Sequence, residues 1–176
     1  MKGINKNSVS LAGEFAVLSQ MALRGYDANM TLGHTKSVDI LVSDPQTGKL
    51  YQLEVKTNYI NDKKKPSVSR IHGKFVSDWI MNKKHEDVDI STLFYCFVNI
   101  SKDTHLFKFY IVPSKVVARY IKEEHQLWID EKKREEKKVK YDTDMRLFRM
   151  GIKNEKYAIN TPTIEQYEDN WDFKTS

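Results

Sequence analysis

The chain has 176 residues, 29 of them basic and 24 acidic, which gives a formal net charge of +5. This length can bury a core of its own, and a hydrophobic content of 40% excludes disorder throughout. No apolar run is long enough to cross a bilayer, and the N-terminus lacks a secretory signal, so we expect a cytoplasmic protein without a membrane segment. The only cysteine, Cys96, lies in an apolar run, which favours a buried, inert thiol.

The N-terminal part of the chain predicts a helix followed by strands. Apolar residues recur at helical spacing over residues 8–24, with Ser8 or Ser10 as the N-cap and Gly25 as the stop. We expect the apolar stripe of this helix to face the core; it consists of Leu11, Phe15, Leu18 and Met21 or Ala22. A short strand over 26–31 follows, and then stronger strands over 37–43 and 50–57 form a hairpin around the turn-rich stretch DPQTGK.

The rest of the chain predicts a second hairpin and a second helix. Residues 58–91 are polar and mixed, with a shorter ordered piece, FVSDWIM. Aromatic and β-branched residues over 92–100 and 106–112 predict two paired strands, and Pro113 opens a helix that reaches about residue 129. The charged run DEKKREEKKVK continues that helix or forms an exposed loop. We expect one α/β domain over residues 1–176, with its core at about 8–130 and a C-terminal extension at about 131–176.

The first hairpin places polar side chains together. If the apolar residues at alternate positions of both strands face the core, Asp39 on one strand shares the opposite face with Glu54 and Lys56 on the other. A turn centred in DPQTGK predicts four pairs across the hairpin: Val38 with Val55, Asp39 with Glu54, Ile40 with Leu53 and Val42 with Tyr51. Two ionised carboxylates at opposed positions repel unless a cation lies between them, and Mg²⁺ suits such a pair.

Glu14 is a fourth candidate for this site. At 100° per residue it lies about 60° from the centre of the expected stripe of Leu11, Phe15 and Leu18, so it stands at the edge of the expected core. A carboxylate in that position needs a partner, which a metal ion or its bound water provides. Lys56, on the face of Glu54, is placed to contact a scissile phosphate or the attacking water.

These residues resemble the motifs of the PD-(D/E)XK nuclease superfamily, which includes type II restriction enzymes and Holliday junction resolvases. The similar pieces are Gly13-Glu14, Gly25-Tyr26, Ser37-Val38-Asp39-Ile40 and Leu53-Glu54-Val55-Lys56, and Val38 departs from the family's proline. The resemblance implies a restriction endonuclease-like core, in which helices flank a mixed central β-sheet. It implies a Mg²⁺ site, with Mn²⁺ as a substitute, held by Asp39, Glu54, the backbone carbonyl of Val55 and Glu14, while Lys56 assists the water.

The expected function is therefore metal-dependent endonucleolytic cleavage of DNA, of the restriction or the repair and recombination type. A homodimer is expected on symmetry grounds, because cutting both strands with one site per chain calls for two copies. Six basic residues are candidates for contacts with the DNA backbone: Lys63, Lys64, Lys65, Lys115, Arg119 and Lys122. For the three lysines at 63–65 an ordinary solvated loop is an equally good interpretation, and for the three residues on the later helix a solvated face is the better one. Two alternatives remain open: a catalytically silent nucleic-acid-binding or protein-binding module, and an accessory subunit of a defence system.

Overall fold

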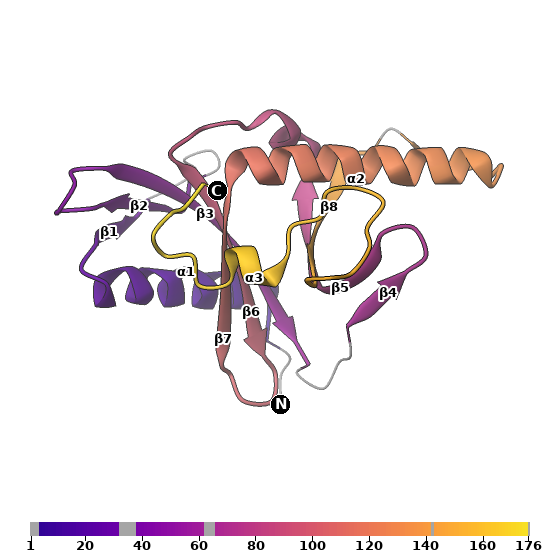
Figure 1. Cartoon of the computed structure of the whole chain (residues 1–176). Coiled ribbons are helices and arrows are strands. Elements are labelled where there is room, and N and C mark those ends of the chain that lie inside the picture. The colour runs from indigo at the N-terminus through magenta and orange to yellow at the C-terminus, as the bar shows by residue number, and fades with distance from the viewer. Residues whose placement is uncertain (1–3, 32–37, 62–65, 142, 176) are drawn as a thin grey trace. The chain divides into compact units, whose positions relative to one another are not determined.

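The computed structural model describes residues 4–31, 38–61, 66–141 and 143–175, and its elements are labelled in Figure 1. The chain divides into two compact units. Unit 1 comprises residues 1–63, 90–113 and 168–176, and unit 2 comprises residues 64–89 and 114–167. Within the described ranges, no helix is both long enough and apolar enough to span a membrane. The expectation of a single nuclease-like domain over the whole chain stays a prediction.

Unit 1 begins with the predicted helix. Helix α1 spans Lys6–Leu23, and its N-cap is Asn5, whose side chain accepts a hydrogen bond from the backbone N–H of Ser8, so neither predicted serine is the cap. The helix ends where expected, since Gly25 takes a left-handed φ of +80° directly after it.

The orientation of α1 differs from the prediction. Leu11 and Phe15, expected in the core, are 46% and 53% exposed. The buried face of the helix instead consists of Gly13, Val17 and Met21, and Leu18 is only half-buried. The physical reason lies in Gly13, because its missing side chain lets the helix backbone approach the sheet: a Cβ there would lie 1.9 Å from Oγ1 of Thr57. The close packing of α1 on the sheet through Gly13 therefore outweighs burial of the larger apolar side chains Leu11 and Phe15.

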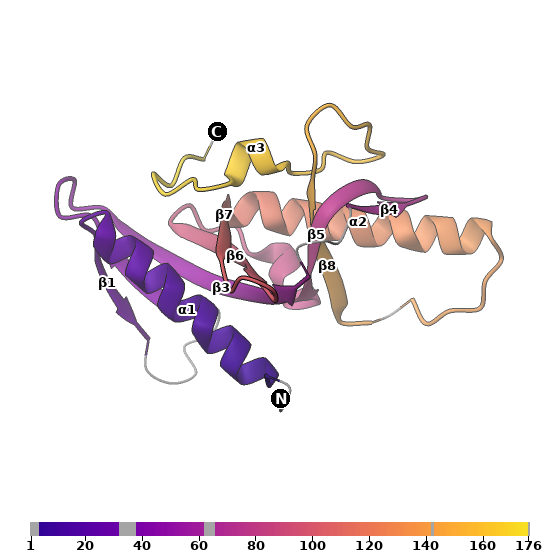
Figure 2. The same cartoon turned by 90° about the horizontal axis from the view of Figure 1, so that it is seen from below.

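The sheet of unit 1 has five strands in the order β1-β2-β3-β6-β7. The strands span Asp27–Met30 (β1), Ile40–Ser43 (β2), Leu50–Ile60 (β3), Leu93–Ser101 (β6) and Phe107–Pro113 (β7). Only β3 and β6 pair in parallel, and the other neighbours are antiparallel. The hydrophobic core on one face of this sheet includes Val17 and Met21 of α1 and Trp171 and Phe173 near the C-terminus. Figure 2 shows α1 running along the sheet beside β1 and β3.

The predicted hairpin register is confirmed for two rungs and stops before the third. Ile40 pairs with Leu53 and Val42 with Tyr51, as expected. Asp39 does not continue the ladder as a regular partner of Glu54: its backbone N–H donates to the carbonyl of Leu53 over 2.8 Å. The side chain of Asp39 turns instead to the backbone of β3, which ends regular pairing at Ile40.

Unit 2 holds elements that the sequence did not resolve clearly. Its sheet has the order β4-β5-β8, all antiparallel, with β4 at Ser67–Ser69, β5 at Gly73–Asn82 and β8 at Met145–Gly151. Strand β5 contains the ordered piece FVSDWIM. The unit also contains the short 3₁₀ helix η1 at Lys83–Asp87, helix α2 at Ser114–Arg134 and helix α3 at Ile164–Tyr167. Helix α2 is five residues longer than predicted and so includes part of the charged run.

The expected fold class is confirmed as mixed α/β, with a mixed five-stranded sheet and flanking helices. Cys96 is buried, as its apolar surroundings predicted, and burial raises the pKa of its thiol far above the usual range.

Candidate metal centre

Asp39 stands just before β2, where its carboxylate reaches the next strand. Its Oδ2 accepts a hydrogen bond from the backbone N–H of Val55 over 2.7 Å. Burial raises the pKa of Asp39 above its usual value, against the opposing effects of the Val55 N–H and the charge of Lys56. No described residue donates a hydrogen bond to the other oxygen of this carboxylate. Asp39 is therefore a half-buried carboxylate, and its burial disfavours the charged form.

Glu54 and Lys56 lie on one face of β3, as their spacing predicts. The Nζ of Lys56 is 2.6 Å from Oε1 of Glu54, and the Glu54 residue is only 4% exposed. The Lys56 side chain is 28% exposed, so its ammonium group stands between the buried carboxylate and solvent. Although Glu54 and Lys56 share the face of β3 opposite the core, Glu54 is almost completely buried there.

Glu14 reaches the same region from α1. Burial raises its pKa, and the negative charge of Asp39 raises it further, whereas a 3.3 Å hydrogen bond from Ser10 and the charge of Lys56 lower it. Glu14 lies about 60° around the helix from the centre of the true buried face, Gly13, Val17 and Met21. The predicted place of Glu14 at the edge of the core is therefore correct, although the stripe from which it was inferred is exposed.

The four predicted residues form a negatively charged group. When ionised, Glu14, Asp39 and Glu54 carry three negative charges, and Lys56 is the one cation among the four. Raised pKa values at Asp39 and Glu14 have the same main cause, which is partial burial, and among the described residues the charge of Lys56 opposes it at both. Within the described ranges, no set of three or more His, Cys, Asp or Glu side chains is close enough to enclose a metal by itself. Any cation here would thus be held by fewer side chains and would need other oxygen donors.

Tyr95 is a neighbour of this group that the sequence did not reveal. It pairs with Glu54 across the parallel β3 and β6 ladder and is completely buried. Burial and the charge of Glu54 raise the pKa of the Tyr95 phenol far above its usual value, so the phenol keeps its proton. Only the pairing of β3 with β6 could have identified it, and the two strands are about 40 residues apart in the chain.

The other predicted residues lie elsewhere. Lys63, Lys64 and Lys65 fall among residues 62–65, outside the described ranges. Lys115, Arg119 and Lys122 are all exposed on α2 in unit 2, where Lys115 lies 3.9 Å from Asp89 in a solvent-exposed ion pair. Their role in DNA binding stays a prediction.

Unit 2 contains a second cluster of ionisable groups with a different character. The buried carboxylate of Glu124 accepts a 2.5 Å hydrogen bond from Arg149 and lies 3.2 Å from Nε2 of His72. Burial and the charge of Arg149 lower the pKa of His72 to about 4, so the imidazole is neutral at pH 7. The negative charge of Glu124 is thus paired with the positive charge of Arg149.

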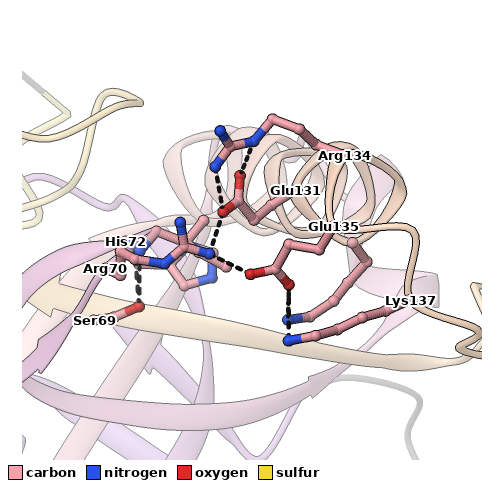
Figure 3. A network of polar contacts seen from close by, with 9 residues as sticks. Ser69, Arg70, His72, Glu131, Arg134, Glu135 and Lys137 are labelled. Atoms are coloured by element: carbon pink, nitrogen blue, oxygen red, sulfur yellow. Dashed lines mark hydrogen bonds and ion pairs between the residues drawn. The ribbon is translucent and has the colours of Figure 1, made fainter.

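Around the C-terminal end of α2, a network of ion pairs joins residues of the helix and of the segment after it to Arg70, which follows β4 in the same unit (Figure 3). Arg70 pairs with both Glu131 and Glu135, Arg134 pairs with Glu131, and Lys137 pairs with Glu135. Cations outnumber carboxylates in this network, because Lys132 also pairs with Glu135. We assign it a structural role.

Comparisons with known proteins give a likeness in chain path but no match in sequence. No protein-family model matches the sequence, and no curated protein is similar to it at a significant level. Among solved structures, the chain is similar to a bacterial homing endonuclease, I-Ssp6803I, at a TM-score of 0.48 and 12% identity. The alignment covers 96% of this chain and 89% of that chain.

Proposed function

We propose that this protein is a metal-dependent endonuclease of the PD-(D/E)XK superfamily that hydrolyses phosphodiester bonds in DNA. The observation that carries the proposal is the group of three carboxylates around β3, from α1 (Glu14), from the residue before β2 (Asp39) and from β3 itself (Glu54), with Lys56 as the cation among the predicted site residues. Ionised groups that are partly removed from water need a compensating charge. A divalent cation with its bound phosphate is the ligand that supplies this charge in a nuclease.

The donor set fits Mg²⁺, with Mn²⁺ as a substitute. Magnesium takes oxygen ligands, commonly from one or two carboxylates together with water and substrate phosphate. Asp39 and Glu54 would supply the carboxylates and Val55 its backbone carbonyl, and Glu14 would bind the water shell or a second ion. When bound, the metal polarises the phosphate and stabilises the leaving oxygen.

The protein's own residues would position the remaining parts of the reaction. The Val55 N–H fixes one oxygen of Asp39, which leaves the other for a ligand. Lys56 carries a partly exposed ammonium group, 2.6 Å from Oε1 of Glu54. In the proposed mechanism Lys56 would part from Glu54, which could then serve as a metal ligand, and would orient a water for in-line attack on phosphorus.

DNA is the proposed substrate, and cutting of the restriction or the repair and recombination type is the proposed role. A duplex has two strands to cut, and one site per chain cuts one of them, which favours a homodimer. The net charge of +5 favours approach to the DNA backbone.

A catalytically silent binding module is the second candidate, and one observation favours it. The short contact between Lys56 and Glu54 already neutralises one carboxylate without any metal. If that ion pair persists in the presence of Mg²⁺, the site keeps its fold but lacks a place for the cation.

Cleavage assays with matched variants separate the two candidates. The full chain is incubated with supercoiled, linear, single-stranded and branched DNA in Mg²⁺ or Mn²⁺, with a chelator as blank. Asp39→Asn, Glu54→Gln and Lys56→Met should each reduce cleavage by about 100-fold or more, because each removes a group that acts on the transition state. Asp27→Asn, which changes an exposed carboxylate on β1 of the same unit, should cut like the parent.

A parent that cuts none of these substrates, or site variants that cut as well as the parent, would overturn the nuclease proposal. Binding of DNA without cleavage would support the silent module.

A further inference from the structure

The outer face of α1 is an unusual surface for a protein of this composition. Charged residues make up 30% of the whole chain, yet the 18 residues of α1 include only two, Lys6 and Glu14. Eight positions of the helix are exposed and uncharged: Asn7 and Ser8 in its first turn, and six further along, Leu11, Ala12, Phe15, Ser19, Ala22 and Leu23. At 100° per residue, these six centre on the side of the helix opposite the buried Gly13, Val17 and Met21. This α1 outer face is therefore a second, apolar face on a helix that already has a core-facing one.

We propose that the α1 outer face is the surface through which two copies of this chain form a dimer. Helix α1 is not amphipathic in the usual sense, because one side packs on the sheet and the opposite side presents large apolar side chains to water. Contiguous apolar patches of several hundred square ångströms on soluble proteins mark sites of association. The proposal does not rest on the nuclease function, because it concerns the protein without DNA.

The exposed area is of the right size for a weak dimer. Ile4, Leu11, Phe15 and Leu23 are 55%, 46%, 53% and 76% exposed. With about 150 to 200 Å² for each side chain of this size, they offer roughly 400 Å² per copy, or about 800 Å² for a pair. Stable interfaces bury about 1,200 to 2,000 Å² in total, and interfaces smaller than this belong to weak, transient complexes. We therefore expect dissociation in the micromolar range.

A second copy is the partner that the charges and shapes favour. Each copy carries a net charge of +5, so most pairings bring like charges together, whereas the α1 outer face has no charge to repel its equivalent. In an antiparallel pair with a two-fold axis near Phe15, Leu11 meets Ser19 of the second copy and Ser8 meets Ala22 of the second copy. Leu11 then faces a small side chain, small residues face each other at the Ser8 and Ala22 positions, and Phe15 packs beside its equivalent at the axis.

Sedimentation velocity on the full chain tests the proposal between roughly 1 and 100 μM, which spans the expected dissociation constant. The parent should shift from monomer to dimer over this range. The double variant Leu11→Glu/Phe15→Glu should stay monomeric, with an unchanged circular dichroism spectrum and melting temperature, because both side chains are exposed. Leu50→Glu is the matched control: it places the same charge on a 67% exposed leucine of the same unit and should dimerise like the parent.

Charge reversal identifies the partner as a second copy. Leu11→Lys/Phe15→Lys should also be monomeric, and an equimolar mixture with the glutamate variant should restore dimers that neither variant forms alone. A parent that stays monomeric to about 100 μM, a glutamate variant that dimerises like the parent, or a mixture that stays monomeric would overturn the proposal. Equal loss of dimer in Leu50→Glu would do so as well.

Discussion

Two regions of this molecule bury a glutamate beside a cation, and they differ in how the charges add up. In unit 2, Glu124 is matched by Arg149, and the neutral His72 completes the contact. In unit 1, Glu54 is matched by Lys56, but Asp39 and Glu14 add two further carboxylates to the same region. Burial raises the pKa of Glu124 as well, but this carboxylate has a guanidinium partner of its own, whereas among the described residues the group in unit 1 holds three carboxylates and one lysine.

The difference separates a structural ion pair from a candidate ligand site. A buried pair that balances itself gains nothing from a further ion, and it destabilises the fold when one partner is removed and the other stays buried. A group with excess negative charge is destabilised as it stands and improves when a cation binds. Opposite responses to mutation are therefore expected in the two regions, and the following experiments measure them.

The largest expected effect is loss of the guanidinium in unit 2. Arg149→Met leaves the buried carboxylate of Glu124 without its cation and should lower the free energy of unfolding by about 3 to 5 kcal/mol, or the melting temperature by roughly 10 °C. The double variant Glu124→Leu/Arg149→Met should lie within about 1 kcal/mol of the parent, because it removes both charges. Equal melting temperatures for the single and double variants would contradict a balanced pair.

The histidine of the same cluster should make stability depend on pH. The folded-state pKa of His72 is about 4, below its ordinary value of 6.5, so the unfolded chain takes up a proton that the folded chain refuses. Stability from this group is complete above pH 6.5 and is lost as the pH falls to 4, by an amount on the order of 3 kcal/mol. Denaturant melts at several pH values should show a smaller loss in His72→Gln than in the parent. An identical pH profile in both would show that His72 is accessible to protons in the fold.

A smaller effect is expected where α1 approaches the candidate site. In Gly13→Ala the new Cβ would stand 1.9 Å from Thr57 Oγ1, so helix and strand must separate. We expect about 1 to 3 kcal/mol of destabilisation, measured by chemical denaturation. Thr57→Ala should recover part of it in the double variant, because it removes the nearest atom. Additive effects of the two substitutions would show that the contact does not set the distance of α1 from β3.

The smallest effect should have the opposite sign. Because burial raises the pKa of Asp39, its charged form destabilises the fold, and Asp39→Asn should be more stable than the parent at pH 7. Each kcal/mol gained in the free energy of unfolding should raise the melting temperature by about 2 to 4 °C. The amide oxygen can still accept the Val55 N–H. Below pH 3.8 both the folded and the unfolded chain protonate Asp39, so the advantage should vanish there and appear as the pH rises past the raised pKa. Lower stability of the variant at pH 7 would remove the difference between the two regions.

The sequence predicts the strands better than it predicts the faces of α1. The hairpin of β2 and β3 follows from strict alternation and a turn signal, and the polar group on β3 follows from it. Helical periodicity predicts α1 correctly but predicts the wrong buried face, because the buried face includes Gly13, and a glycine does not contribute to an apolar pattern.

Long-range pairing explains the elements and residues that were missed. Strand β8 contains Arg146 and Arg149, which disguise its apolar pattern, and their partners Glu86 and Glu124 are distant in sequence. Tyr95 likewise enters the site only through the parallel pairing of β3 with β6. Local patterns carry no information on either arrangement.

Titration calorimetry with Mn²⁺ on the full chain, without DNA, tests the central claim that the carboxylates of unit 1 form a cation site. The parent should bind Mn²⁺, binding should weaken as the pH falls towards the raised pKa of Asp39, and Asp39→Asn/Glu54→Gln should abolish it. Glu124→Leu/Arg149→Met should bind Mn²⁺ like the parent. Failure of the parent to bind, or equal binding by the Asp39→Asn/Glu54→Gln variant, would contradict the account.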